Sequence, residues 1–234
     1  LKRYLQGLQK NIPSGHAAGD ESGMAPSLCA KATGQLGAAL FHLHFLGIAH
    51  GDVKPANVLL VHPVQAWQPG GSVIDESRFA LKLCDFGFAC ICGDEKLRSY
   101  CGTPAYLAPE VITPADAHKG YLGRPVDMWA LGCVLYEMIH CRMGFPSQQA
   151  FELEACVREG HHQPIKKSAS PSAKVLLNGL LMGETSRRMT AEQVVHNPWV
   201  HDALHPPSVT VEDDSSDRRQ IAGDEGKQGS TSPT

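Results

Sequence analysis

The stretch from Val126 to Ile139 is apolar on almost every side of a helix, because Asp127 and Glu137 are its only charged residues. A helix with this pattern has no face suited to water and is stable only when other elements surround it. It is also shorter than the roughly 20 apolar residues of a membrane span. The sequence therefore predicts a domain that packs around one central helix.

Helical spacing of apolar residues recurs on both sides of this stretch. The further expected helices cover Leu1 to Gln9, Ser27 to Gly47, Ser147 to Glu159, Ser172 to Met182 and Thr190 to His196. Ser27 is expected to cap the second of these and Gly47 to end it, while Thr190 and Gln193 have the spacing of a capping box. Two short strand-like runs, Val58 to Val61 and Phe79 to Leu83, flank a Pro-Gly-Gly turn region. The predicted fold class is mostly α, with a short β-hairpin region.

The composition fits one folded unit. With 234 residues, of which 42% are hydrophobic, the chain can bury one sizeable core. We expect a domain at residues 1–201 and a disordered tail at 202–234, where Pro, Ser, Asp, Gly and Lys dominate. Residues 11–26 are rich in Gly, Ser, Ala and Pro and predict a flexible insertion within the domain.

The charge and the cysteine content argue against several classes of partner, location and metal site. The formal net charge is −3 and the basic residues are scattered, which predicts neither a nucleic-acid partner nor a membrane partner. The eight cysteines have no secretory context and no Cys-x-x-Cys pair, so we expect reduced thiols and an intracellular location, cytoplasmic or nuclear. The Cys90-x-Cys92 spacing matches no zinc site.

Two motifs carry the chemistry: the run from His50 to Asn57, which reads His-Gly-Asp-Val-Lys-Pro-Ala-Asn, and Asp85-Phe86-Gly87. Asp52 is suited to orient a hydroxyl and accept its proton, and the Lys54 ammonium is suited to neutralise a phosphate. Asn57 and Asp85 offer oxygen atoms of the kind that Mg²⁺ prefers. This combination is typical of phosphoryl transfer.

The motifs that follow make the pattern specific. They are Gly102-Thr103-Pro104-Ala105-Tyr106-Leu107-Ala108-Pro109-Glu110, Asp127 to Gly132, Arg188-Met189-Thr190 and His196-Asn197-Pro198-Trp199. In this order they closely resemble the large, C-terminal lobe of a eukaryotic protein kinase, over residues 1–201. The resemblance implies ATP and Mg²⁺ as cofactors and a protein with a Ser or Thr acceptor as substrate. It implies catalytic roles for Asp52, Lys54 and Thr103, nucleotide contacts for Lys54, Asn57, Leu59 and Asp85, and metal binding by Asn57 and Asp85.

The resemblance extends to the type of kinase. Serine/threonine kinases have Lys at the position of Lys54 and a Thr at the position of Thr103 that contacts the catalytic Asp and Lys. The runs Cys101 to Pro104 and Asn197 to Trp199 are most similar to the calcium/calmodulin-dependent group. Ala56 stands where many basophilic kinases have Glu, so recognition of a basic motif is not predicted.

Three further residues are expected to have structural roles by the same resemblance. Glu110 and Arg188 match the pair that ties the activation segment to the last helices. Asp127 matches the residue that accepts hydrogen bonds from the backbone of the catalytic loop. Gly51 departs from the pattern, because most members have Arg here, whose guanidinium pairs with a phosphate on the activation segment.

The family binds nucleotide between two lobes, and the small lobe comes first in the chain. Before His50 there is no Gly-x-Gly-x-x-Gly loop and no Val-Ala-x-Lys strand. We therefore expect a fragment without the small lobe, inactive by itself. The alternative is a pseudokinase or an orphan lobe that binds partners through a groove near the helix at Ser147 to Glu159. The sequence does not identify a regulator.

Overall fold

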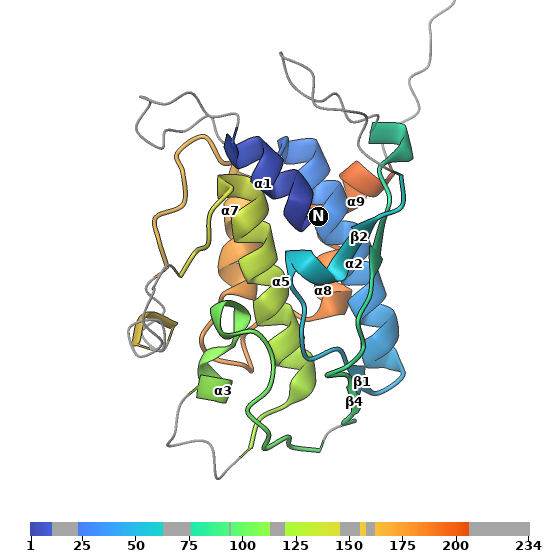
Figure 1. Cartoon of the computed structure of the whole chain (residues 1–234), viewed down its shortest axis with the longest axis vertical. Coiled ribbons are helices and arrows are strands. Elements are labelled where there is room, and N and C mark those ends of the chain that lie inside the picture. Colours follow the sequence, from blue (N-terminus) through green and yellow to red (C-terminus); the bar gives the residue numbers. More distant parts are fainter. Residues whose placement is uncertain are drawn as a thin grey trace, which may run out of the picture.

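The computed structural model describes residues 1–10, 23–62, 76–93, 95–112, 120–145, 155–157 and 162–205 (Figure 1). Helix α5 (Gly123–His140) lies at the centre of the described part. Trp129, Leu131 and Tyr136 are fully buried on it, as are most of its other residues. The prediction of a central buried helix is confirmed. The helix ends at Cys141, which has a left-handed backbone with φ +52° and donates its N–H to the Glu137 carbonyl.

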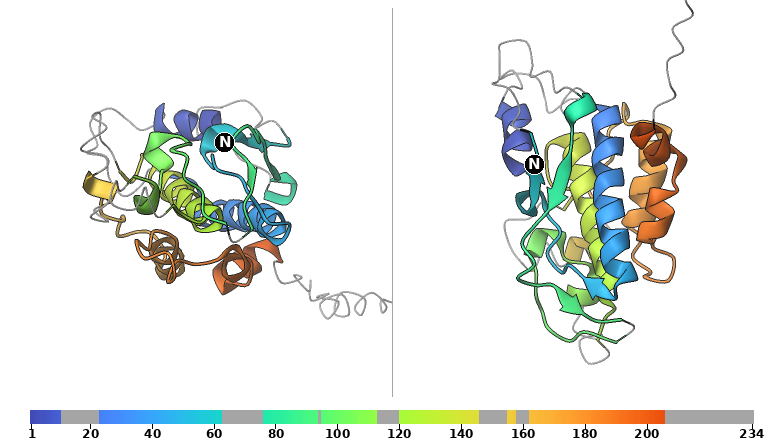
Figure 2. Two further views of the ribbon diagram at one scale, coloured as in Figure 1. Left: turned by 90° about the horizontal axis from the view of Figure 1, so that it is seen from below. Right: turned by 90° about the vertical axis from the view of Figure 1, so that its right-hand side faces the viewer.

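The longest helix, α2 (Pro26–Phe45), packs between α5 and the pair formed by α8 (Ala191–Val195) and α9 (Pro198–Leu204) (Figure 2). Two glycines of α2 allow this close approach. A Cβ atom at Gly34 would lie 2.7 Å from Val200 Cγ1, and one at Gly37 would lie 2.8 Å from Val194 Cγ1. A side chain at position 34 would therefore push α2 away from α9, and one at position 37 would push α2 away from α8.

The ends of α2 differ partly from the prediction. The helix begins at Pro26 with Ala25 as N-cap, and no side chain caps it. Ser27 instead donates its hydroxyl to the Glu76 carboxylate at 2.7 Å, so its predicted capping role is wrong. At the other end, the expected stop is confirmed, because Gly47 adopts φ +73° just beyond the C-cap Leu46.

The remaining helices are α1 (Lys2–Lys10), α3 (Pro109–Ile112) and α7 (Pro171–Leu180), with the short 3₁₀ turns η1 (Pro55–Asn57), η2 (Glu76–Arg78) and η3 (Pro104–Tyr106). Helices α1 and α7 lie close to predicted ranges, whereas α3, α9 and the 3₁₀ turns were not predicted. Thr190 and Gln193 form the predicted capping box of α8. Helix α9 continues to Leu204, beyond the domain boundary expected at residue 201.

Several sequence expectations lie largely or wholly outside the described residues. They concern the flexible insertion at 11–26, the disordered tail and most of the helix expected at Ser147 to Glu159, of which residues 155–157 are described as helical. Within the described ranges, no helix is both long and apolar enough to cross a membrane.

Two small antiparallel sheets, each of two strands, lie at the edge of the helical bundle (Figure 1). Strand β1 (Ile48–Ala49) pairs with β4 (Cys90–Ile91), and Ala49 lies opposite Cys90. Strand β2 (Val58–Leu60) pairs with β3 (Leu81–Leu83), and Val58 lies opposite Leu83. Strands β2 and β3 lie within the two runs predicted as strands but are shorter than those runs. The pair of β1 and β4 was not predicted. Residues 50–57 and 84–89 connect the two sheets.

A buried histidine closes the C-terminal end of the central helix. His140 stacks on the Tyr136 ring with centroids 3.9 Å apart, and its Nδ1 donates to the Tyr136 carbonyl at 2.8 Å. Its Nε2 accepts the backbone N–H of Lys166 at 3.0 Å, so the ring is held in the neutral Nδ1–H form. Burial is the main cause that lowers the pKa of His140 to about 4; the hydrogen bond to the Tyr136 carbonyl opposes this shift, and the charges of Lys166, Arg142 and His162 add to it.

We expect the free energy of unfolding to fall as the pH is lowered from about 6.5 to about 4. In this range the unfolded state takes up a proton at His140 that the folded state excludes, so this group destabilises the fold by up to about 3 kcal/mol. Urea unfolding at several pH values measures the effect. The variant His140→Gln should have a flatter profile than the parent, whereas His201→Gln, at an exposed position, should not. Identical profiles for the parent and His140→Gln would contradict the assignment.

Candidate active site

The two small sheets place the two predicted motifs, residues 50–57 and 85–87, at one site. Strand β1 leads directly into His50, and η1 delivers Asn57 to the start of β2. Strand β3 returns beside β2, and the backbone N–H of Cys84 donates to the Asn57 carbonyl at 2.9 Å. Asp85 is the next residue, so it leaves the sheet beside Asn57. Residues far apart in the sequence are therefore brought together by backbone pairing alone.

The Asp52 carboxylate lies at the centre of the site and is 4% exposed. Its Oδ2 contacts Lys54 Nζ at 2.6 Å and accepts a hydrogen bond from Asn57 Nδ2 at 2.9 Å. Its Oδ1 accepts a hydrogen bond from the Thr103 hydroxyl at 2.8 Å. Three donors from two segments thus fix both carboxylate oxygens, and the side chain has one orientation.

These donors also decide its charge. Burial by itself would raise the pKa of Asp52, but the hydrogen bonds from Lys54 and Thr103, the Lys54 charge and the Asn57 amide outweigh burial and lower it below the usual value. The carboxylate is therefore ionised at neutral pH. An ionised carboxylate is an acceptor, and it is able to take a proton from a hydroxyl placed beside it.

Lys54 and Thr103 join two segments: residues 50–57, which match the catalytic loop of the family that the sequence resembles, and residues 85–110, which match its activation segment. Lys54 Nζ donates to Thr103 Oγ1 at 2.7 Å, and the Lys54 side chain is 22% exposed, so part of the ammonium faces solvent. Thr103 directly precedes η3 and is its N-cap. The structure therefore brings Asp52, Lys54 and Thr103 together, as the sequence predicted for the catalytic set.

Asn57 and Asp85 form the part of the site suited to a metal ion. Asn57 Nδ2 donates to the carbonyl and to the carboxylate of Asp52, each at 2.9 Å, which turns the amide oxygen away from Asp52. Asp85 is exposed and has φ +66°, a conformation that costs energy for a residue with a side chain. The Asp85 carboxylate accepts only the Gly87 N–H among the contacts described, at 3.3 Å, and stays exposed. An amide oxygen and an exposed carboxylate fit Mg²⁺, which keeps several waters. No group of three His, Cys, Asp or Glu suited to a metal occurs among the described residues.

Asp127 accepts hydrogen bonds from the backbone of the catalytic loop, as predicted. Its Oδ2 accepts the backbone N–H of His50 at 2.8 Å, and its Oδ1 accepts that of Gly51 at 2.9 Å. A third partner, His44, was not predicted; its Nε2 lies 2.9 Å from Oδ2. Gly51 itself adopts φ +77°, which glycine does without strain.

The predicted pair of Glu110 and Arg188 is also present. Arg188 Nη1 and Nη2 donate to the two Glu110 oxygens at 2.6 and 2.9 Å, and the Arg188 side chain is 0% exposed. The guanidinium also donates to the Pro125 carbonyl at 2.8 Å and lies over the Trp129 ring. The pair thus fastens α3 to the start of α5.

One further contact at the site was not predicted. The Tyr106 hydroxyl donates to the Glu137 carboxylate at 2.7 Å, joining η3 to α5, and burial raises the pKa of Glu137 above its usual value. The only advance signal was that Glu137 is charged within an apolar stretch. Leu59, which was predicted to contact nucleotide, lies on β2, two residues after Asn57, and is 53% exposed.

Several known proteins are similar in sequence to this chain. The liver/testis isoform of the phosphorylase b kinase gamma catalytic chain of Mus musculus is 34% identical over 167 residues, which cover 69% of this chain and 37% of that protein. Serine/threonine-protein kinase DCLK1 of Rattus norvegicus is 37% identical over 175 residues, covering 71% and 36%. The probable serine/threonine-protein kinase fhkE of Dictyostelium discoideum is 31% identical over 179 residues, covering 75% and 24%.

The matched part of the chain thus spans between a quarter and two fifths of the length of these relatives. Residues 9–200 match the family described as protein kinase domain, and this match covers most of the chain. The matched range contains every residue of the site described above. We conclude that this chain belongs to the protein kinase family.

Proposed function

We propose that the chain is the large lobe of a serine/threonine protein kinase, which transfers the γ-phosphate of ATP to a Ser or Thr hydroxyl of a protein substrate. The observation that carries this proposal is the buried, ionised Asp52, held by Lys54 and Thr103. A carboxylate in this state, with an ammonium beside it, is matched to a hydroxyl nucleophile and a phosphate.

Each residue of the site has one task in this mechanism. Asp52 accepts a hydrogen bond from the substrate hydroxyl, orients its oxygen for attack and takes its proton. Lys54 stands 2.6 Å from Asp52 and places positive charge beside the transferring phosphate. Thr103 holds both side chains in place. Asn57 and Asp85 would hold Mg²⁺, which supplies positive charge to the phosphate oxygens when bound.

We infer further that activity requires a small lobe. Leu59, Phe86 and Phe88 are each about half exposed, at 53%, 51% and 48%, although they flank the residues assigned to nucleotide and metal. Large apolar side chains exposed beside a site favour a covering partner. A nucleotide and a second lobe would provide this cover. The 234 residues alone are then expected to transfer no phosphate.

A chimera tests the proposal. The small lobe of a related serine/threonine kinase is joined to residue 1, and transfer of labelled phosphate to a Ser/Thr peptide library is measured. We expect transfer by the chimera and none by either part alone. A Tyr-only library and the Lys54→Met chimera serve as controls. A folded chimera that binds nucleotide but transfers no phosphate would favour the alternative, a pseudokinase or interaction module. Against that alternative stands the intact set of Asp52, Lys54, Asn57 and Asp85.

The finer assignments are part of the same proposal. Cys101 to Pro104 and Asn197 to Trp199 support membership of the calcium/calmodulin-dependent group. An intracellular location, cytoplasmic or nuclear, is supported by the cysteines, all eight of which are free thiols.

We expect phosphorylation of the activation segment to have little influence on activity. The family reads such a phosphate with an Arg at position 51, and Gly51 has no side chain to pair with it. In the chimera, Ser99→Ala should retain kcat/KM close to that of the parent after phosphatase treatment of both. Thr103→Ala should lose activity, because its hydroxyl contacts Asp52 and Lys54. A large loss in Ser99→Ala that Ser99→Glu restores would contradict this expectation.

A further inference from the structure

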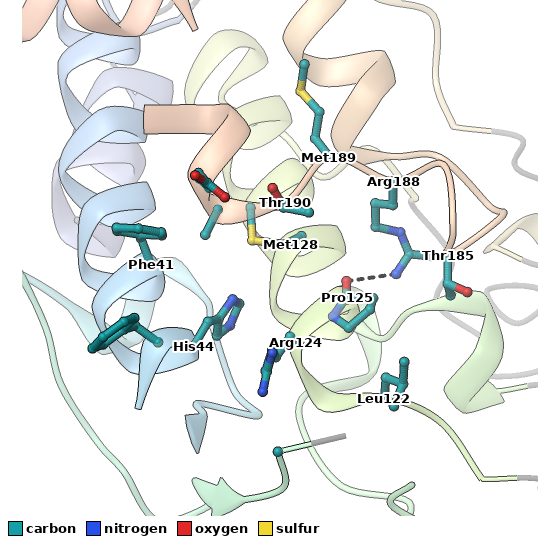
Figure 3. A pocket seen from close by; sticks show the side chains of 14 residues that line it. Phe41, His44, Leu122, Arg124, Pro125, Met128, Thr185, Arg188, Met189 and Thr190 are labelled. Atoms are coloured by element: carbon teal, nitrogen blue, oxygen red, sulfur yellow. Dashed lines mark hydrogen bonds between the residues drawn. The ribbon is translucent and has the colours of Figure 1, made fainter. Parts of the chain in front are cut away.

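A cavity in the described part of the structure lies away from the proposed catalytic residues. It has a volume of about 380 Å³, and it is bounded by the end of α2, the start of α5 and the segment that leads into α8 (Figure 3). None of Asp52, Lys54, Asn57, Asp85 and Thr103 lines it. Its volume falls within the range of ligand-binding pockets in proteins.

The lining is mainly apolar and open to solvent. Phe41 of α2 and Met128 of α5 line the cavity, as does Met189, which precedes α8 (Figure 3). Phe45, the last residue of α2, also belongs to the lining. At the mouth, Phe45 is 81% exposed, and Phe41 and Leu122 are 39% and 40% exposed. Such a concentration of exposed apolar surface around a cavity favours an occupant that covers it.

We propose that residues 208–214 of this chain, which lie outside the described structure, occupy this cavity through Val209 and Val211. These two valines and Ile221 are the only large aliphatic residues after His205. They are two positions apart, so in an extended chain both point to the same side. The chain thus carries one short apolar segment in an otherwise polar stretch, and it follows directly after α9.

The distance fits this segment. Helix α9 ends at Leu204, whose Cδ1 atom would be 2.8 Å from a Cβ at Gly34 of α2. Phe41 and Phe45 lie further along the same helix, at roughly 10 and 16 Å from Gly34 at ~1.5 Å per residue. An extended chain advances ~3.3 Å per residue, so Val209 and Val211 reach up to roughly 16 and 23 Å from Leu204. Pro206 and Pro207 favour an extended exit from the helix.

The position of the acidic residues after the two valines also agrees with the position of Arg124 in the cavity. In Figure 3, Phe41, His44, Arg124 and Leu122 follow one another along one side of the cavity. A chain that arrives from α9 meets Phe41 first, with the uncharged Ser208 to Thr210. The acidic residues Glu212 to Asp214 come next and approach Arg124, to which they are attracted through space.

Occupation of the cavity bears on the catalytic loop. His44 lines the cavity and also bonds to Asp127, which holds the backbone of His50 and Gly51. Apolar cover over His44 excludes water from this contact. The docked segment thereby shields the contact of His44 with Asp127, which holds the backbone of residues 50 and 51.

Methionine methyl NMR on the full 234-residue chain tests the proposal, because Met128 and Met189 line the cavity. The double variant Val209→Asp/Val211→Asp should shift both signals. Ile221→Asp, the matched control, should leave them unchanged, and Val209→Ile/Val211→Ile should preserve the parent positions. A peptide of residues 206–217 added to the Asp variant should move both signals back toward the parent.

Two outcomes would overturn the proposal. One is that the Asp variant leaves Met128 and Met189 unshifted, or shifts them no more than Ile221→Asp does. The other is that the shifts depend on protein concentration and sedimentation shows a dimer, which would assign the occupant to a second copy of the chain. Activity plays no part in these measurements, so they stand apart from the test of kinase function.

Discussion

We expect Asp52→Asn to lower kcat of the chimeric kinase by ~10²- to 10⁴-fold, the range for loss of a positioned general base. The amide keeps the shape of the side chain but cannot accept the proton of the substrate hydroxyl. Nucleotide affinity should be nearly unchanged, because Asp52 contacts Lys54, Thr103 and Asn57 within the chain and acts on the hydroxyl. Steady-state kinetics and ATP titration measure the two quantities separately.

Asp85→Asn is the matched comparison, since it makes the same chemical change at the exposed carboxylate. Here the loss should appear in Mg²⁺-dependent ATP binding, because an amide oxygen is a weaker ligand for this ion. If both variants showed the same profile of kcat and nucleotide affinity, the division of roles between Asp52 and Asp85 would be wrong.

The second large effect is expected on stability. Arg188→Met should lower the free energy of unfolding by ~3–5 kcal/mol, the range for breaking a buried ion pair. The guanidinium is fully buried and makes two bonds to Glu110 and one to Pro125, and methionine leaves these acceptors without a donor. Urea unfolding of the 234-residue chain measures the change.

Arg187→Met is the control from the neighbouring position. Arg187 is 68% exposed, and its contact to Glu184 is 3.8 Å long. Exposed pairs of this kind contribute ~0–1 kcal/mol. Equal losses in the two variants would show that the buried pair does not stabilise the fold as proposed. If Arg188→Met fails to fold, the double variant with Glu110→Gln should recover part of the stability, because the unpaired carboxylate is then gone.

Elements whose stability depends on local sequence were predictable. Helix α5 is apolar on nearly every side, and α8 begins with a capping box, so each could be located from its own residues. Ser27 shows the limit of this reasoning. Its hydroxyl was free either to cap α2 or to bond elsewhere, and Glu76, 49 positions away, is its partner in the fold. Contacts with such distant residues are not encoded in local patterns.

At the candidate site, too, contacts within known motifs were predictable and contacts made only by tertiary packing were not. The contacts among Asp52, Lys54 and Thr103 were predicted because motifs with known order carry these residues. His44 and the pair of Tyr106 and Glu137 were missed, because each bonds to a residue on another element that only tertiary packing brings near. Whether Leu59 contacts nucleotide stays a prediction.

The attachment of both substrate-facing segments to helix α5 has a mechanical consequence. Asp127 fixes the catalytic loop to this helix, and Arg188 fixes Glu110 of the activation segment to the Pro125 carbonyl, within the same first turns. Thermal displacement of α5 therefore carries the two segments together, and their separation fluctuates less than the position of either. The loop that carries Asp52, the general base in the proposed mechanism, and the segment that carries Glu110 are thus both anchored to the central buried helix.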